Sequence, residues 1–129
     1  MRIISGKFKG KKIQQPKDDK TRPLKDLAKE SIFNIIEHSK KINFGLTGSL
    51  VLDLFSGVGS FGIECLSRGA KKIIFIENYL NVLPVLKKNL EDLKLLINAK
   101  ITALPAPPQP KTNIFFLSLK SSKELVAPK

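Results

Sequence analysis

The stretch VLDLFSGVGSFG, from Val51 to Gly62, contains the residue types of a cofactor-binding loop. Its glycines follow the pattern Gly57-x-Gly59-x-x-Gly62, the spacing of a dinucleotide-binding turn between a strand and a helix. Such glycines let the backbone approach a ligand, and the helix that follows presents free N–H groups. Asp53 interrupts the otherwise apolar strand four residues before the first glycine. The chemistry of this carboxylate indicates which cofactor the loop favours.

Asp53 favours a positively charged cofactor over a nicotinamide dinucleotide. A dinucleotide places its pyrophosphate at the helix N-terminus, where a nearby carboxylate would repel it. S-adenosylmethionine has no phosphate and carries an ammonium and a sulfonium group, so a carboxylate attracts it directly or through water. A nicotinamide-dependent oxidoreductase leaves Asp53 unexplained, and the sequence offers no residues suited to hydride transfer. The other interpretation of Asp53 is a buried acid that accepts hydrogen bonds from loop amides.

Glu77 is a second candidate acid for the same site. It stands 20 residues after Gly57, at the end of the next expected strand, where a ribose-binding acid belongs in either cofactor class. A carboxylate there can accept hydrogen bonds from both ribose hydroxyls, and the alternative is a strand-end charge that faces water. The order of strand, Asp53, glycine loop, helix, strand and Glu77 favours the cofactor interpretation.

Hydrophobic periodicity places these residues in alternating strands and helices. Ser49–Phe55 is a nearly continuous apolar run, which predicts a strand covered on both faces. Pro84 is tolerated in the first turn of a helix capped at Asn81, and Gly69 ends the preceding helix. The other expected elements are helices at Leu24–Glu37 and Ser60–Ser67 and strands at Lys72–Glu77, Lys100–Leu104 and Asn113–Leu119. This order predicts an α/β fold with a parallel sheet and right-handed crossovers.

The expected helix at Leu24–Glu37 is amphipathic. Apolar residues recur in it at spacings of three and four, which is the helical period. The predicted apolar stripe consists of Leu24, Leu27, Ala28, Ile32, Phe33, Ile35 and Ile36.

The formal charge of the 129-residue chain is +12, which favours a polyanionic partner, with nucleic acid first and an acidic membrane surface second. The charge is about +7 over residues 1–46, zero over 47–92 and +5 over 93–129. The N-terminal runs Arg2–Ile4, Lys7–Lys9 and Lys11–Ile13 predict a small basic hairpin or meander. A merely solvated charged face is the alternative. The candidate RNA contacts are Arg2, Lys7, Lys9, Lys11, Lys12 and Arg22.

The remaining reactive residue types predict no further chemistry. Cys65 is the only cysteine and lies in an apolar helix, so we expect a small buried side chain. His38 has no partner at metal-ligand spacing, and we expect a solvated residue at a helix end and no metal site. No apolar run reaches the ~18 residues of a membrane span. We therefore expect a soluble cytoplasmic protein without a membrane partner.

Two segments of the sequence resemble one known family. The motif DLFSGVG followed by GIECLSRGA and IIFIE resembles the first motif of the bacterial 16S rRNA guanine-N2 methyltransferases, the RsmD family. MRIISGKFKGKKI, TRP and KESIFNII resemble the basic hairpin and leading helix of that family, and the likeness runs to about residue 95. It implies a Rossmann-like S-adenosylmethionine-dependent methyltransferase fold that acts on 16S rRNA or the small ribosomal subunit. By this resemblance the cofactor contacts are Asp53, Phe55, Ser56, Gly57, Val58, Gly59, Glu77 and Asn78.

The C-terminal third departs from the family pattern. The family carries an Asn- or Asp-Pro-Pro-Tyr motif after its fourth strand, where this chain has IFFLSLKSS, with Ser118 near the expected position. The acid expected after the third strand is also missing, and about 82 residues after Gly48 accommodate only three or four strands. We therefore expect a C-terminally incomplete fold, no identifiable catalytic residue and no methyl transfer by this chain. The competing hypothesis is a noncatalytic basic RNA-binding module.

These expectations divide the chain into two parts. Residues 1–46 are expected to form the basic hairpin and leading helix. Residues 47–129 are expected to form the partial methyltransferase domain.

Overall fold

The computed structural model of the protein describes residues 1–18, 24–40, 42, 44–104 and 115–119. Its helices are α1 (Asp26–His38), α2 (Ser60–Ser67) and α3 (Leu83–Asp92), with short 3-10 turns η1 (Leu80–Val82) and η2 (Leu96–Asn98). Its strands are β1 (Leu50–Leu54), β2 (Lys72–Glu77), β3 (Ala99–Ala103) and β4 (Phe115–Leu119). The predicted bounds of α2 and β2 match the observed ones residue for residue. No described helix is long and apolar enough to cross a membrane.

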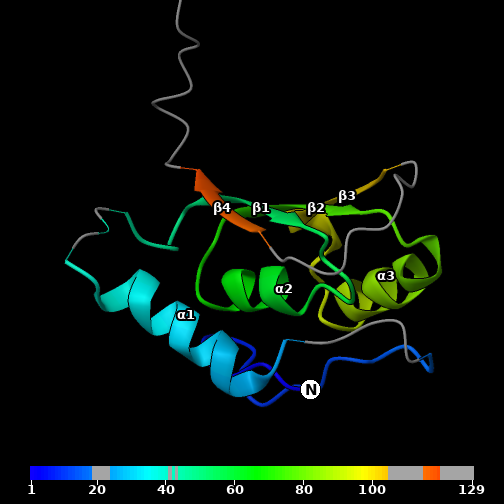
Figure 1. Ribbon diagram of the computed structural model, residues 1–129, viewed down its shortest axis with the longest axis horizontal. Coiled ribbons are helices and arrows are strands. Elements are labelled where there is room, and N and C mark those ends of the chain that lie inside the picture. Colours follow the sequence, from blue (N-terminus) through cyan, green and yellow to red (C-terminus); the bar gives the residue numbers. More distant parts are fainter. Residues whose placement is uncertain (19–23, 41, 43, 105–114, 120–129) are drawn as a thin grey trace, which may run out of the picture.

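The strands form one sheet in the order β3-β2-β1-β4. β1 pairs in parallel with β2, and β2 pairs in parallel with β3. Figure 1 shows α2 and α3 against one face of this sheet, with α1 in a further layer beyond α2. Three parallel strands with connecting helices confirm the predicted α/β fold.

The fourth strand corrects the prediction of a wholly parallel sheet. β4 is antiparallel to β1, with Phe115 opposite Leu54 and Leu119 opposite Leu50. β3 ends at the edge of the sheet where β1 and β2 also end, and β4 starts at that same edge. A parallel β4 would need a crossover of about a dozen or more residues, usually a helix. β4 instead starts at the shared edge and runs in the opposite direction to β1.

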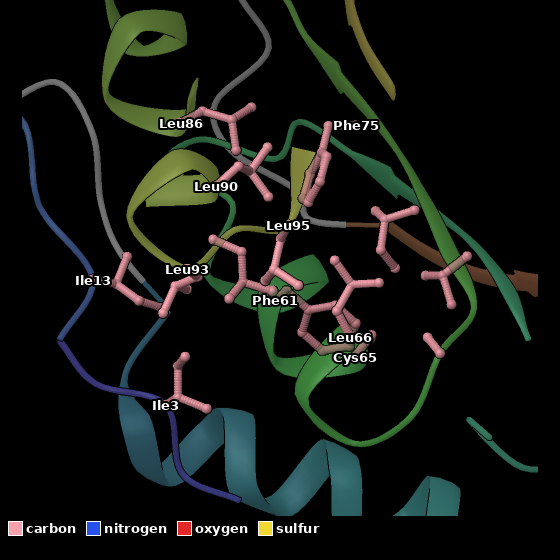
Figure 2. Packing of buried hydrophobic residues seen from close by; sticks show 14 of the residues in the cluster. Ile3, Ile13, Phe61, Cys65, Leu66, Phe75, Leu86, Leu90, Leu93 and Leu95 are labelled. Carbon is pink, nitrogen blue, oxygen red and sulfur yellow. The ribbon is translucent and has the colours of Figure 1, made fainter. Parts of the chain in front are cut away.

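The core lies between the sheet and the helices. Val51 and Phe75 on the sheet, Ile63 on α2 and Leu86 on α3 are almost completely buried. Figure 2 shows Ile3 and Ile13 of the N-terminal segment on the side of this cluster where Phe61 and Leu93 lie. Both parts of the predicted division contribute to one cluster of buried residues, and the boundary at residues 46 and 47 stays a prediction.

The buried face of α1 differs from the predicted stripe. Lys29, Phe33 and Ile36 are its buried residues, whereas Leu27 and Ile35 are 77% and 60% exposed. The Phe33 ring stacks on Phe61 of α2 at 4.8 Å between centroids. Apolar residues lie on more than one side of this helix, so periodicity alone could not identify the side that packs on α2.

The N-terminal hairpin is confirmed, with one change in its interior. Arg2 and Lys12 form an antiparallel bridge, and the Ile3 N–H donates to the Lys11 carbonyl at 2.9 Å. Residues 5–10 form bends and turns, so the run Lys7–Lys9 is part of the connection and not a strand. A hairpin this short leaves no room for a third strand.

The start of α3 also differs from the prediction. Pro84 occupies its first turn, as expected, but the N-cap residue is Val82 and not Asn81. The 3-10 turn η1 already includes Asn81 and runs directly into α3. The Asn81 side chain donates to the Tyr79 hydroxyl at 3.3 Å instead of capping the helix.

Candidate functional site

The loop between β1 and α2 has the tight geometry that its glycines predict. Phe55, Gly57 and Gly59 all have positive φ values, of 58°, 54° and 80°. A Cβ atom at Gly59 would lie 2.3 Å from Cδ1 of Leu86, so the backbone approaches α3 closely here. The Gly59 carbonyl accepts the first helical hydrogen bond of α2, from the Ile63 N–H at 2.8 Å. Sequence and structure therefore agree on a strand, a tight turn and a helix.

Glu77 ties this loop to the end of β2. Its Oε2 accepts the Gly57 N–H at 2.6 Å, and its Oε1 accepts the N–H groups of Asn78 and Tyr79 at 2.8 Å each. The residue is 5% exposed, so the interpretation as a charge facing water is wrong. The carboxylate lies where the loop and the end of the next strand meet.

Asp53 lies on the neighbouring strand and is 1% exposed. Its Oδ2 accepts the Gly62 N–H at 3.0 Å, in the first turn of α2, where a helix favours negative charge. The pKa of Asp53 is raised to about 7. Burial is the main cause of the rise, the Gly62 hydrogen bond opposes it, and the charge of Glu77 adds to it. Asp53 is thus a buried acid that accepts a backbone N–H, as its alternative interpretation predicts, but the donor lies in α2 and not in the loop. This hydrogen bond leaves open a second role, because a nearby cation would favour the ionised form.

The other predicted cofactor residues lie in the same loop or, for Asn78, directly after β2. Val58 is buried, and Phe55, Ser56 and Asn78 are half-buried. The Oγ atoms of Ser56 and Ser60 are buried and have no hydrogen-bond partner among the described residues. These hydroxyls, the two acids and the close backbone approach at the glycines fit a ligand that carries both hydroxyl groups and positive charge. The residues at this edge therefore suit S-adenosylmethionine.

Asn89 of α3 is a supporting residue that the sequence analysis missed. Its Nδ2 donates to the Val58 carbonyl of the glycine loop at 3.1 Å and to the Gln14 carbonyl at 3.2 Å. Its Oδ1 accepts the Gln14 N–H at 2.8 Å. The available signal was a polar residue directly beside Leu90, on the apolar side of the helix.

Five of the six predicted RNA contacts lie together on the hairpin. Arg2, Lys7, Lys9, Lys11 and Lys12 are all exposed, whereas Arg22 lies outside the described residues. The ammonium groups of Lys7 and Lys11 lie 5.6 and 5.7 Å from the centre of the Phe8 ring, and Phe8 itself packs against the core. The hairpin therefore presents a compact basic surface.

The sequence analysis also missed two charged residues, Glu64 and Lys29. Both side chains are completely buried, and their charged groups lie 3.5 Å apart. A single acid in the apolar helix Ser60–Ser67 was the available signal. In α1, Lys29 precedes Phe33 by four residues and Ile36 by seven, which places it on their face.

Ser118 does not lie where the missing catalytic motif was expected. In the antiparallel β4 it pairs with Val51, whereas Phe116 pairs with Asp53. The end of β4 therefore lies beside the start of β1, at the opposite edge from the glycine loop. The structural equivalence of Ser118 to the motif position is wrong, because that equivalence required a parallel strand.

Cys65 and His38 lie in the surroundings that the sequence predicts for them. Cys65 is completely buried, and burial raises the pKa of its thiol well above the usual range. His38 is exposed at the end of α1. No group of acidic, histidine and cysteine residues within the described ranges is arranged to hold a metal ion.

An open groove of about 650 Å³ lies away from the glycine loop. It is formed by the hairpin and α1, and both Lys9 and Glu30 line it. Its mixed charges give it no clear ligand. The candidate cofactor site is therefore defined by the residues of the β1–α2 loop and not by this groove.

The chain resembles rRNA methyltransferases in sequence and a putative methyltransferase in structure. The Ribosomal RNA small subunit methyltransferase D of Haemophilus influenzae is 40% identical over 94 residues, which cover 73% of this chain and 46% of that protein. Its Escherichia coli counterpart is 31% identical over 121 residues, covering 91% and 58%. The solved structure of Escherichia coli yhhF, described as a "putative methyltransferase", matches with a TM-score of 0.62 and 31% identity, covering 78% and 50%. The chain spans about half the length of the curated relatives it matches.

The fold and the loop define a partial Rossmann-like methyltransferase domain with a basic N-terminal hairpin. A model of the family described as "Conserved hypothetical protein 95" matches residues 1–117. The chain belongs to this family, the RsmD family, which confirms the resemblance found in the sequence.

Proposed function

We propose that this chain binds S-adenosylmethionine as part of a 16S rRNA guanine-N2 methyltransferase. The observation that carries the proposal is the pair of buried acids at the ends of adjacent parallel strands, with the glycine loop between them. When bound, this cofactor supplies an activated methyl group on its sulfonium. The residues of the chain bind and orient it.

Each loop residue has a role in this proposal. Glu77 accepts hydrogen bonds from the ribose hydroxyls, and Asp53 attracts the positive end of the cofactor. The unpartnered hydroxyl of Ser56 offers a further hydrogen bond. Phe55, Gly57, Val58, Gly59 and Asn78 form the surrounding wall.

The proposed RNA surface is the basic hairpin. Its exposed cations bind the phosphates of 16S rRNA or of the small ribosomal subunit, with Arg22 as a further contact. A protein with this task works in the cytoplasm. The guanine amine as methyl acceptor comes from the family resemblance.

Isothermal titration with S-adenosylmethionine tests the cofactor proposal. Glu77→Gln should weaken binding by about tenfold or more, because it removes a charged acceptor from the ribose position. Glu91→Gln on the exposed side of α3 is the matched control and should bind like the wild type. Absence of binding by the wild type would reject the proposal.

The alternative is a noncatalytic basic RNA-binding module, favoured by the five exposed cations of the hairpin. Filter binding to a 16S rRNA transcript tests this surface. Replacing Lys7, Lys9 and Lys11 by alanine together should reduce the slope of the logarithm of the binding constant against the logarithm of the salt concentration by about two to three. RNA binding without cofactor binding would favour this alternative, and a wild-type slope near zero would remove both RNA proposals.

Methyl transfer by the chain itself is a separate question. The sequence lacks the Asn- or Asp-Pro-Pro-Tyr motif, so no described residue orients a guanine amine toward the sulfonium. We expect purified chain 1–129 to transfer no labelled methyl group to small subunits or 16S rRNA. Incorporation above a no-enzyme control would show that another residue replaces the motif.

A further inference from the structure

Residues 4–10 of the hairpin, called here the basic turn, are attached to the second half of α2. The first attachment is through one buried acid. Glu64 is completely buried, and its Oε2 and Oε1 accept the N–H groups of Ile4 and Ser5 at 2.9 Å each. Its Oε1 also accepts the Arg68 Nε–H at 3.0 Å, and the Lys29 ammonium lies 3.5 Å from Oε2. A buried carboxylate needs such partners, because an unpaired charge is costly away from water.

Ser67, at the end of α2, extends this attachment along the turn. Its hydroxyl donates to the Ser5 carbonyl at 2.6 Å and accepts the Phe8 N–H at 3.0 Å. Its backbone carbonyl accepts the Lys7 N–H at 2.7 Å. Glu64 and Ser67 of this one helix thus accept hydrogen bonds from four backbone N–H groups of the turn, those of Ile4, Ser5, Lys7 and Phe8.

Gly6 lies at the point of closest approach. Its φ is 79°, and a Cβ atom there would lie 1.9 Å from the Ser67 carbonyl oxygen. Gly10, at the other end of the turn, has nearly the same φ of 83°, but a Cβ atom there would meet no atom of the described residues within 4 Å. The two glycines therefore share a backbone conformation and differ in their contact with α2.

Helix α1 also holds the same segment. The Lys29 ammonium donates to the Arg2 carbonyl at 2.9 Å. Arg68 pairs with Glu37 of α1 at 2.9 Å, and its guanidinium lies 4.3 Å from the centre of the Phe33 ring. The basic segment is thus fastened to two helices by buried or partly buried groups.

We propose that the second half of α2 is a dock that holds the basic turn in its RNA-binding conformation, with Glu64 and Ser67 as positioning residues. The proposal rests on the proposed RNA binding by the hairpin and adds a mechanism to it. The first turn of α2 contacts Asp53 through Gly62, so one eight-residue helix, about 12 Å long, carries the cofactor loop at one end and the basic turn at the other. A pre-ordered turn binds RNA more tightly, because less conformational freedom is lost on binding.

The comparison of Gly6→Ala with Gly10→Ala tests the dock. Both changes impose the same unfavourable φ on alanine, but only Gly6→Ala forces the turn away from Ser67. Gly6→Ala should weaken binding to a 16S rRNA transcript by about tenfold, whereas Gly10→Ala should stay within about twofold of the wild type. Neither change should alter the affinity for S-adenosylmethionine, which separates loss of positioning from general unfolding.

Amide hydrogen exchange provides a readout that needs no RNA. The N–H groups of Ile4, Ser5, Lys7 and Phe8 should exchange faster in Gly6→Ala and not in Gly10→Ala. Ser67→Ala, which adds no bulk, should accelerate the exchange of Phe8 and weaken RNA binding in the same direction.

The outcomes distinguish this inference from the proposed function. If the wild type binds RNA and Gly6→Ala binds equally well, the dock has no role in RNA binding and the inference is overturned alone. If the wild type does not bind RNA, the proposed RNA surface fails and this inference fails with it. Faster exchange and weaker RNA binding in Gly6→Ala, with the cofactor affinity retained, support it.

Discussion

Buried carboxylates lie at both ends of α2, at Asp53 beside its first turn and at Glu64 near its last. Glu64 has two cationic partners, Lys29 and Arg68. Asp53 and its neighbour Glu77 form no ion pair with any basic side chain within the described residues, and only backbone N–H groups neutralise them. The charge at the Glu64 end is compensated by the chain, whereas the charge at the glycine-loop end is not.

This difference separates a structural site from a candidate ligand site. A compensated buried charge holds elements together and needs no further partner. Two uncompensated acids beside a tight glycine turn raise the energy of the empty, ionised site, and a cationic ligand lowers it again. The same helix therefore has a buried ion-pair network near one end and a candidate cofactor site at the other.

Removing the compensated acid should have the largest effect on stability. Glu64→Ala leaves the buried cations Lys29 and Arg68 without their shared partner and should lower the free energy of unfolding by about 3–5 kcal/mol. Urea denaturation measures this loss. The matched control Glu91→Ala, on the exposed side of α3, should leave stability almost unchanged. Equal effects of the two changes would mean that the buried network does not fasten the hairpin.

Titration of Asp53 should have the next largest effect. Its pKa rises from 3.8 in the unfolded chain to about 7 in the folded one, because burial disfavours the charged form. The folded state therefore binds more protons, and the stability that is present below pH 3.8 is lost as the pH rises through about 7. The total loss should be on the order of 4 kcal/mol, at about 1.4 kcal/mol per unit.

Urea denaturation between pH 4 and 8 measures this loss as the difference between the wild type and Asp53→Asn. The variant lacks the titrating group, so its decline over this range should be smaller. Asp92→Asn, on the surface of α3, keeps Asp53 and should show the full decline. Parallel profiles for the wild type and Asp53→Asn would show that Asp53 is ionised across the whole range.

The close approach of Gly59 to α3 should have the smallest effect on stability of the three. Gly59→Ala places a Cβ atom 2.3 Å from Cδ1 of Leu86, which must move within the core. Gly48 has a similar φ of 75°, but a Cβ atom there would meet nothing within 4 Å in the part of the chain that the structure describes. Gly59→Ala should therefore be less stable than Gly48→Ala by about 1–3 kcal/mol and should also bind S-adenosylmethionine more weakly. Thermal denaturation and calorimetry measure the two effects, and equal stability would mean that Leu86 moves aside freely.

The elements around the glycine loop were predictable because their local signals agree. Ser60–Ser67 and Lys72–Glu77 are largely apolar segments with clear boundaries at Gly59, Gly69 and the charged strand ends. Asp53 and Glu77 could be placed at the ends of adjacent strands for the same reason, since parallel strands end at one edge of a sheet. Their roles in cofactor binding stay predictions.

Features that depend on distant contacts were missed or misplaced. The direction of β4 depends on the edge at which β3 ends, which no local pattern of Phe115–Leu119 records. The face of α1 depends on α2, which accepts Phe33 and excludes Leu27. Arg68 and Asp26 are partners of Glu64 and Lys29 within one helical turn, but the buried contact between Glu64 and Lys29 joins two helices that are 35 positions apart in the chain.

The sequence by itself determined the order of the elements, the tight turn at Gly57–Gly59, the basic hairpin and membership in the RsmD family. These depend on residue types at short spacing, where steric limits and hydrophobic periodicity act directly. Only the tertiary structure decided that β4 runs antiparallel, that Lys29 is buried beside Glu64, and that Gly6 lies against Ser67. The hydrogen bonds of Glu64 to Ile4 and Ser5 join residues about 60 positions apart, and its contact with Lys29 joins residues 35 positions apart, so no short stretch of sequence contains these partners.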